Sequence, residues 1–174
     1  ELAGQLLNYS RQGRIEKQTV EYDASSAVQE SVNMIERLLP KNIRLKTNLC
    51  RTPYYVRGQL GSLNQILLNL TTNAIYEMKE EGSLYIRFGL STESDRFLRL
   101  LVEDTGKGIP SEIQRQIFRP FFTTKGAGDG TGIGLTVVKR LTEEHGGSIF
   151  VQTEEGRGTR FLLEFPRVYP DGEE

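Results

Sequence analysis

Five glycines alternate with other residues from Gly126 to Gly134, immediately before a segment with the apolar spacing of a helix. Glycine loses more backbone entropy on folding than any other residue, so such a run requires a reason. One reason is access to peptide N–H groups, and the free N–H groups of a helix N-terminus add an anion site at the same place. The run therefore predicts a phosphate-binding loop, although the glycines alone leave a flexible surface linker open. Their spacing of two excludes the P-loop and Rossmann glycine patterns.

Lys125 directly precedes this run, where its ammonium group could meet a terminal phosphate. A surface lysine without a role is equally compatible with the sequence. Phe118, Phe121 and Phe122 lie just upstream, and aromatic side chains at this density usually anchor a loop against a core. The segment thus predicts an anchored loop that carries a cation toward the glycine run.

A second motif, Asp104-Thr-Gly106-Lys-Gly108-Ile109, follows the apolar residues 100–102. An aspartate with two nearby glycines commonly forms only a turn. The functional interpretation is that Asp104 accepts a hydrogen bond from an exocyclic amine. A buried carboxylate would favour adenine over guanine, because a mismatched base would leave it unpaired. Gly106 and Gly108 would then let the backbone approach a flat ring.

Gln65, Asn69 and Asn73 are spaced by four residues and share one face of an expected helix. Asparagine is a mediocre helix former, so two of them beside an apolar stripe are unexpected. A carboxamide oxygen can ligate Mg²⁺, which takes few protein ligands alongside phosphate oxygens. Polar residues at the edge of a buried helix are the alternative. Thr159, further along the chain, would reach Asp104 only if their two strands are neighbours.

The elements that must position these residues follow from apolar periodicity and from breaker residues. Helices are expected at residues 1–12, 23–39, 60–78, 111–118 and 131–144, and strands at 19–22, 43–49, 84–90, 97–103, 148–153 and 159–165. Asp23 and Ser25 are the candidate N-caps of the second helix. Because the strands cluster in hairpins, the pattern predicts an α+β two-layer sandwich rather than a doubly wound sheet.

Composition limits the classes of function. The chain has 174 residues, 37% of them apolar, which is enough for one domain with a core. A net charge of −1 argues against nucleic acid or an anionic membrane as the main partner. Cys50 is the only cysteine, so no internal disulfide forms and a reducing compartment is expected. The chain opens at Glu1 with a helical pattern, and we expect it to be part of a longer protein.

In their order and spacing, these motifs resemble the GHKL, or Bergerat, nucleotide-binding fold, and more narrowly the catalytic ATP-binding domain of sensor histidine kinases. The resemblance covers about residues 20–165 and rests on an Asn box (69–74), two glycine boxes (104–108 and 130–135), a Phe box (118–122) and the Gly158-Thr159 pair. The short stretch between Lys125 and Gly130 is similar to the short ATP lid of the nitrogen-regulation class.

The resemblance implies a mixed, mostly antiparallel sheet of about five strands with three helices on one face. It implies ATP and Mg²⁺ as cofactors, with Asn73 as the metal ligand, and Asn69 and Lys125 as the catalytic residues. Asp104 would pair with the adenine amino group, helped by Thr159. The implied cofactor-binding set is Asn73, Ala74, Asp104, Gly106, Gly108, Ile109, Phe118, Lys125, Gly130, Thr131, Gly132, Ile133, Gly134, Leu135 and Thr159. The lid between Gly126 and Asp129 is expected to be disordered without ATP.

One position separates the relatives by activity. ATPases of this superfamily carry a glutamate four residues before the metal asparagine, where it activates water, whereas this chain has Asn69, which cannot act as a base. The resemblance therefore implies phosphoryl transfer to a protein histidine rather than hydrolysis. A non-catalytic nucleotide-sensing module and a GHKL-type ATPase remain the alternatives.

The resemblance also implies partners outside the chain. His145 is the only histidine, and it resembles the structural His-Gly-Gly of the family. The acceptor histidine would therefore lie on a separate dimerisation domain, and the fragment would not phosphorylate itself. We expect residues 1–18 to be the end of the second dimerisation helix with a linker, 19–168 the catalytic domain and 169–174 a tail. A response regulator, a homodimeric full-length protein and a cytoplasmic location are expected, with membrane attachment of the full-length protein left open.

Overall fold

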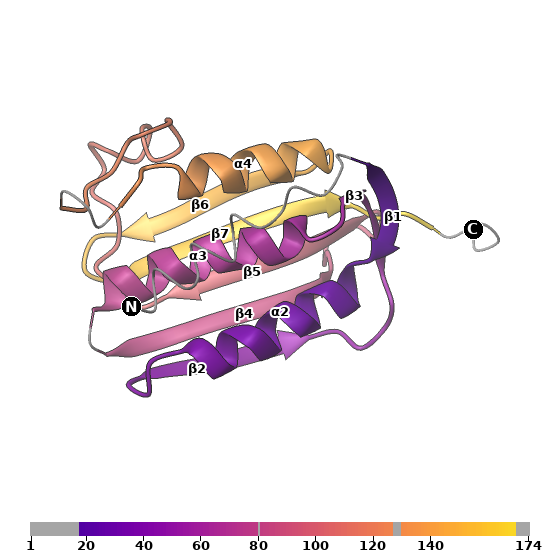
Figure 1. Cartoon of the computed structure of the whole chain (residues 1–174), viewed down its shortest axis with the longest axis horizontal. Helices are drawn as coiled ribbons and strands as arrows, with labels where there is room; N and C mark the ends of the chain where they lie inside the picture. Colours follow the sequence, from indigo (N-terminus) through magenta and orange to yellow (C-terminus); the bar gives the residue numbers. More distant parts are fainter. Residues whose placement is uncertain (1–17, 80, 127–129, 170–174) are drawn as a thin grey trace.

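The computed structural model describes residues 18–79, 81–126 and 130–169 and shows two layers, a sheet and a layer of helices. In chain order the elements are β1 (Thr19–Asp23), α2 (Ala24–Leu38), β2 (Ile43–Leu49), β3 (Tyr55–Gln59), α3 (Ser62–Met78), β4 (Gly82–Leu90), β5 (Phe97–Asp104), α4 (Gly134–Glu144), β6 (Ser148–Glu154) and β7 (Gly158–Pro166). The helices α2, α3 and α4 lie side by side on one face of the sheet (Figure 1). The predicted α+β sandwich is confirmed. None of the helices in these ranges is long and apolar enough to cross a bilayer.

The main sheet has five strands in the order β2-β4-β5-β7-β6. Only β2 and β4 are parallel. The pairs β4–β5 and β6–β7 are antiparallel hairpins, and β5 and β7, which are distant in the chain, also pair antiparallel. The predicted hairpins β4–β5 and β6–β7 are therefore confirmed. The register between β5 and β7 places Asp104 directly opposite Thr159, which is the condition that the sequence left open.

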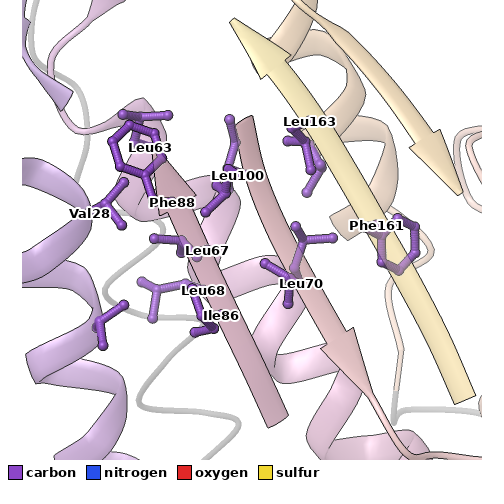
Figure 2. Packing of buried hydrophobic residues seen from close by; sticks show 14 of the residues in the cluster. Val28, Leu63, Leu67, Leu68, Leu70, Ile86, Phe88, Leu100, Phe161 and Leu163 are labelled. Carbon is purple, nitrogen blue, oxygen red and sulfur yellow. The ribbon is translucent and has the colours of Figure 1, made fainter. Parts of the chain in front are cut away.

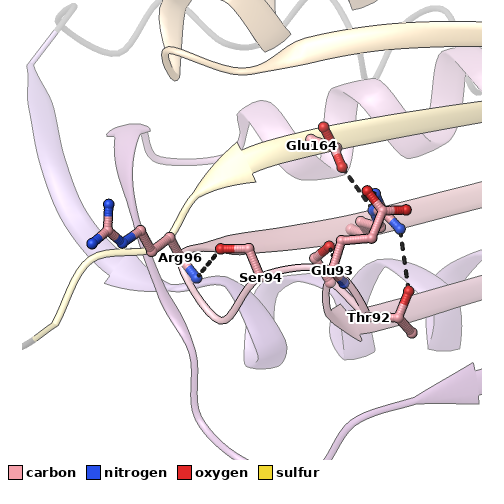
Figure 3. Close-up of polar contacts among 7 residues, drawn as sticks. Thr92, Glu93, Ser94, Arg96 and Glu164 are labelled. Atoms are coloured by element: carbon pink, nitrogen blue, oxygen red, sulfur yellow. Dashed lines mark hydrogen bonds and ion pairs between the residues drawn. The ribbon is translucent and has the colours of Figure 1, made fainter.

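The loop between β4 and β5 is held by charge at the end far from Asp104. Arg99 on β5 forms an ion pair with Glu164 on β7 at 2.7 Å and with Glu93 in the loop at 3.2 Å. Figure 3 shows Glu164, Glu93 and Thr92 gathered at this turn. These contacts tie the hairpin to the neighbouring strand at the end far from Asp104.

Helix α3 is the centre of the core. Its buried side chains Leu63, Leu67 and Leu70 lie between the helix and the strands, against Phe88 and Leu100 among others (Figure 2). Each of these three leucines is no more than 1% exposed. Full burial of such a side chain contributes about 1.5–3 kcal/mol. The apolar side of α3 thus fixes the position of its polar side relative to the sheet.

Helix α2 begins where the sequence predicted. The carboxylate of Asp23 accepts hydrogen bonds from the backbone N–H groups of Ser25 at 2.9 Å and Ser26 at 3.2 Å. Such a cap satisfies N–H groups that have no partner within the helix. The helix ends at Leu38, before Pro40.

Two expectations are wrong in detail, and one strand was not expected. Residues 111–118 form successive turns rather than a helix, with N–H groups bonded three residues back, as from Ile113 to Pro110 and from Gln116 to Ile113. Eight residues are short for an α-helix, and the three-residue hydrogen bonds of this segment close turns instead. Helix α4 begins at Gly134 rather than at residue 131, because Gly132 has a φ of +66°, which is not helical. The strand β3 was not expected at all, and it pairs with β1 in a separate two-stranded sheet. The helix expected at 1–12 lies outside the described residues.

His145, which caps the C-terminus of α4, is a structural residue that packs against this second sheet. It is 6% exposed, its Nδ1 lies 2.7 Å from the carbonyl oxygen of Leu141, and its Nε2 lies 2.9 Å from the hydroxyl of Tyr22. Because a carbonyl only accepts, Nδ1 carries the proton and Nε2 accepts from Tyr22. Burial lowers the pKa of the His145 ring, so the neutral form dominates. The histidine therefore joins β1 to the end of α4 and is not accessible as a phosphoacceptor.

Gly58 on β3 leaves the space that this ring fills. A Cβ at Gly58 would overlap the His145 ring, which packs edge-on against Phe165. We expect Gly58→Ala to lower the free energy of unfolding by about 1–3 kcal/mol, the usual cost of overpacking. Urea denaturation measures this change. Gly89→Ala on β4 is the control, since its Cβ would lie at an ordinary 3.6 Å from Cys50. Equal losses in the two variants would contradict the packing described.

Candidate nucleotide-binding site

A cavity of about 280 Å³ opens between α3, the N-terminus of α4 and the ends of β5 and β7. Most of the predicted site residues line it, namely Asn69, Asn73, Ala74, Asp104, Gly108, Ile109, Lys125, Gly130, Thr131, Gly132, Gly134, Leu135 and Thr159. Gly106, Phe118 and Ile133 lie outside the lining. Phe118 packs against the core, and Ile133 is 40% exposed. The central stretch of the expected lid, 127–129, lies outside the described residues.

Asp104 is a buried carboxylate in the wall. It ends β5, is 7% exposed and accepts a hydrogen bond from the N–H of Gly106 at 2.8 Å. Burial raises the pKa of its carboxyl to about 6, and backbone hydrogen bonds from Gly106 and Thr159 partly oppose the rise, while Glu77 and Glu103 add to it. A ligand that donates a hydrogen bond to Asp104 would stabilise the ionised form.

A threonine that the sequence did not single out joins the two halves of this wall. The hydroxyl of Thr153 on β6 accepts from the N–H of Ile109 at 2.9 Å and donates to the carbonyl of Gly158 at 3.0 Å. It also lies 3.1 Å from the hydroxyl of Thr159. Because the Thr153 proton goes to Gly158, the Thr159 hydroxyl is the donor of this last bond. Thr153 thus fixes the positions of Ile109 and Thr159 beside Asp104.

The turn after β5 is clamped onto α3 by an ion pair. Lys107 Nζ lies 2.9 Å from Glu77 Oε2, and both residues line the cavity. Gly108 has a φ of +72°, and a Cβ there would overlap the carbonyl of Glu154. Only glycine is compatible with that backbone and that space. Glu77 and Lys107 were not predicted, since a charge pair on two distant segments has no signature in the sequence.

Helix α4 points its N-terminus at the polar face of α3. A Cβ on Gly134, the first residue of α4, would lie 3.8 Å from Asn69 Oδ1 and 3.9 Å from Asn73 Nδ2. The first N–H groups of a helix have no partner within it, and they carry the positive end of the helix dipole. The side chains of Asn69 and Asn73 opposite this terminus are neutral amides, so they would not repel an anion there. Free N–H groups at this terminus would favour an anion bound beside the two asparagines.

The ammonium group of Lys125 lies in the same cavity. Its Nζ donates to Asn73 Oδ1 at 3.2 Å and sits 4.2 Å from the centroid of the Tyr76 ring. A cation on this carboxamide oxygen indicates a site that accepts positive charge. An amide oxygen is also an ordinary ligand for Mg²⁺, so the residues present fit that ion.

Apolar residues of the segment before Lys125 complete the wall. The residues that line the cavity without having been predicted are Thr72, Glu77, Lys107, Pro110, Ile113, Ile117, Phe122, Thr123, Thr124 and Phe161. Ile117 is 6% exposed and belongs to the core. The aromatic and apolar spacing of 113–122 could have indicated this wall, but a helix was expected over much of it.

Comparison with known proteins identifies this arrangement. The sequence pattern of the histidine kinase-, DNA gyrase B- and HSP90-like ATPases matches residues 58–169. Sensor kinase CckA of Brucella abortus is 34% identical over 96% of this chain and 19% of its own length. Sensor histidine kinase ZraS of Salmonella typhimurium is 32% identical over 96% of this chain and 35% of its own length. The chain thus spans about a fifth to a third of the length of these relatives.

Solved structures of histidine kinases have the same fold as this chain. The nucleotide-free catalytic domain of the histidine kinase ThkA superposes with a TM-score of 0.72 at 30% identity, over 86% of this chain and 95% of that one. Full-length ShkA in complex with AMPPNP also gives a TM-score of 0.72, at 28% identity, over 97% of this chain and 36% of that one. The chain belongs to the histidine kinase-, DNA gyrase B- and HSP90-like ATPases. Within that family it is an ATP-binding catalytic domain of the sensor histidine kinases.

The raised pKa of Asp104 predicts how the stability of the domain depends on pH. The Asp104 carboxyl keeps its proton up to about pH 6 in the folded state, whereas an unfolded aspartate releases it near pH 3.8. Since the unfolded state binds fewer protons between these values, the free energy of unfolding falls as pH rises through this window. At about 1.4 kcal/mol per pKa unit, the loss is up to about 3 kcal/mol.

We expect Asp104→Asn to remove this decline and to raise the melting temperature of the nucleotide-free domain at pH 7.5. Thermal unfolding from pH 4 to 8 measures both effects. Glu103→Gln is the control, because Glu103 is on the same strand and pairs with Arg160 at 2.8 Å. Since Glu103 adds less to the Asp104 pKa shift than burial does, most of the decline should remain in this variant. If Asp104→Asn kept the full decline, the burial of the ionised carboxylate could not be its cause.

Proposed function

We propose that this domain binds Mg-ATP and donates the γ-phosphate to a histidine on a separate dimerisation domain of the same kinase. The proposal rests on one observation: a buried carboxylate, two asparagines, a lysine and a helix N-terminus line the same cavity. These groups match the two ends of a nucleoside triphosphate in chemistry. Asp104 accepts a hydrogen bond from the adenine amino group, and the other groups face the phosphates.

The spacing along α3 supports this orientation. The turn after Asp104 meets the helix at Glu77, while the N-terminus of α4 meets it at Asn69 and Asn73. Asn69 and Glu77 are eight residues apart, which is roughly 12 Å along a helix at 1.5 Å per residue. That length separates a base from its β- and γ-phosphates. The adenine therefore lies near the Glu77 end and the phosphates near Asn69.

Asn73 is the protein ligand for Mg²⁺ in this proposal, and Asn69 supports the metal and the phosphates. Mg²⁺ is usually held by one or two protein groups together with phosphate oxygens and water. The ion would neutralise the charge that accumulates on the transferred group. Lys125, whose Nζ lies 3.2 Å from Asn73 Oδ1 in this structure, would yield that oxygen to the ion and supply a second positive charge to the phosphates. Phosphoryl transfer depends mainly on such positioning and charge stabilisation.

Asn69 favours transfer over hydrolysis. A carboxamide cannot take a proton from water, so the nucleophile must come from elsewhere. His145 is buried and hydrogen-bonded, which makes it unsuitable as the acceptor. We therefore assign the acceptor to a dimerisation domain whose last helix would end within residues 1–18. A response regulator would receive the phosphate in turn.

The experiment combines this domain with a purified dimerisation domain of the same kinase in trans. We expect acid-labile phosphate on the dimerisation domain with ATP and Mg²⁺, and none on this chain alone. Asn73→Ala should abolish the transfer. Steady release of inorganic phosphate by the isolated domain, lost in Asn73→Ala, would instead support an ATPase. Tight ATP binding without either reaction would support a nucleotide sensor.

We also expect Asp104→Asn to weaken ATP binding by more than tenfold, which is about 1.4 kcal/mol. The carboxamide can no longer attract the adenine amino group as an ionised carboxylate does, and its own NH₂ opposes that amine. Isothermal calorimetry at pH 7.5 measures the change, with Glu103→Gln as the control of equal charge. Unchanged ATP affinity in Asp104→Asn would remove the adenine assignment.

A further inference from the structure

Two residues of helix α3 contact the ammonium group of Lys125. Asn73 and Tyr76 are three residues apart on α3 and so are neighbours on its surface. The Lys125 ammonium is 3.2 Å from Asn73 Oδ1 and 4.2 Å from the centroid of the Tyr76 ring. The carboxamide oxygen and the ring face attract the same charge from two directions. The contact lies beside the asparagines that face the N-terminus of α4.

Tyr76 has no place in the cavity itself. Its side chain is absent from the lining, and the residue is 37% exposed. An aromatic ring at such a position would ordinarily be a surface residue without a role. Its ring is nevertheless a partner of Lys125, the lysine that the proposed function aims at the terminal phosphate.

We propose that Tyr76 is a positioning residue for Lys125. The Tyr76 ring holds the Lys125 ammonium beside Asn73, so that the γ-phosphate of ATP meets a cation that is already in place. The proposal rests on the proposed function of the same site. A long lysine side chain loses rotamer freedom when it is fixed, and contact with the ring reduces that loss at the moment of binding. The effect favours ATP over ADP, because ADP lacks the phosphate that Lys125 would meet.

A matched pair at the other end of the protein provides the control. The guanidinium of Arg167 lies 4.2 Å from the centroid of the Tyr169 ring, and Tyr169 is 39% exposed. Distance and exposure are thus nearly the same as for Tyr76, and Tyr169 is not in the cavity lining. Arg167 also lies 4.9 Å from the centroid of the Tyr54 ring, and the Tyr169 hydroxyl donates to the carbonyl of Asp95 at 3.2 Å. Tyr169→Leu therefore removes at least as much surface contact as Tyr76→Leu does, without touching the site.

The test measures ATP and ADP affinities by calorimetry, with magnesium present, for wild type, Tyr76→Leu, Tyr76→Phe and Tyr169→Leu. We expect Tyr76→Leu to weaken ATP by two- to fivefold, which corresponds to the about 0.5–1 kcal/mol of an exposed cation–π contact, and to leave ADP unchanged. Tyr76→Phe keeps the ring face and should bind as wild type does. Tyr169→Leu should change neither affinity.

A double-mutant cycle separates positioning from local structure. In a Lys125→Met background, Tyr76→Leu should cause no further loss of ATP affinity, since the residue acts only through the lysine. Losses that simply add, or an equal loss for ADP, would overturn the proposal. Wild-type protein that binds no ATP would overturn the proposed function itself, whereas wild-type binding with an unaffected Tyr76→Leu would overturn only the role of Tyr76.

Discussion

Helix α3 faces the apolar core on one side and the polar cavity on the other, and the geometry of the site depends on the orientation of this helix. Leu63, Leu67 and Leu70 hold it against the sheet, with almost no exposed surface. Their burial leaves the helix no freedom to rotate, because any rotation would expose leucine and bury amide. The same packing therefore sets the direction of Asn69 and Asn73 toward α4.

The Asp104 carboxylate shows that this site is held at a cost in stability. Its burial raises the pKa to about 6, so near neutral pH the nucleotide-free domain keeps an ionised group in a poorly solvated place. The surroundings limit that cost without removing it, through the N–H of Gly106 and the register that sets Thr159 opposite. A ligand that donates a hydrogen bond recovers part of the loss. Affinity and selectivity for an amine-bearing base would thus have one physical origin.

Much of the fold followed from local pattern. The helix α2 with its Asp23 cap, the long α3 and the two hairpins were expected, because periodicity and capping are local properties. The expectation failed where local preference was weak. The short strand β3 exists because β1 pairs with it, and its Gly58 accommodates a ring that comes from the far end of α4. The turns at 111–118 carry helical composition but lack the length to sustain a helix.

The sequence by itself determined which chemical groups this domain can offer: the spaced asparagines, the aspartate before two glycines, the lysine and the glycine run. Their types and order sufficed to identify the family. Only the tertiary structure decided which of these groups share a cavity, that Thr153 and the Glu77–Lys107 pair brace its walls, and that Tyr76 faces Lys125. Such contacts join residues tens of positions apart, and strand register and helix packing set them. Neither leaves a mark in the local sequence.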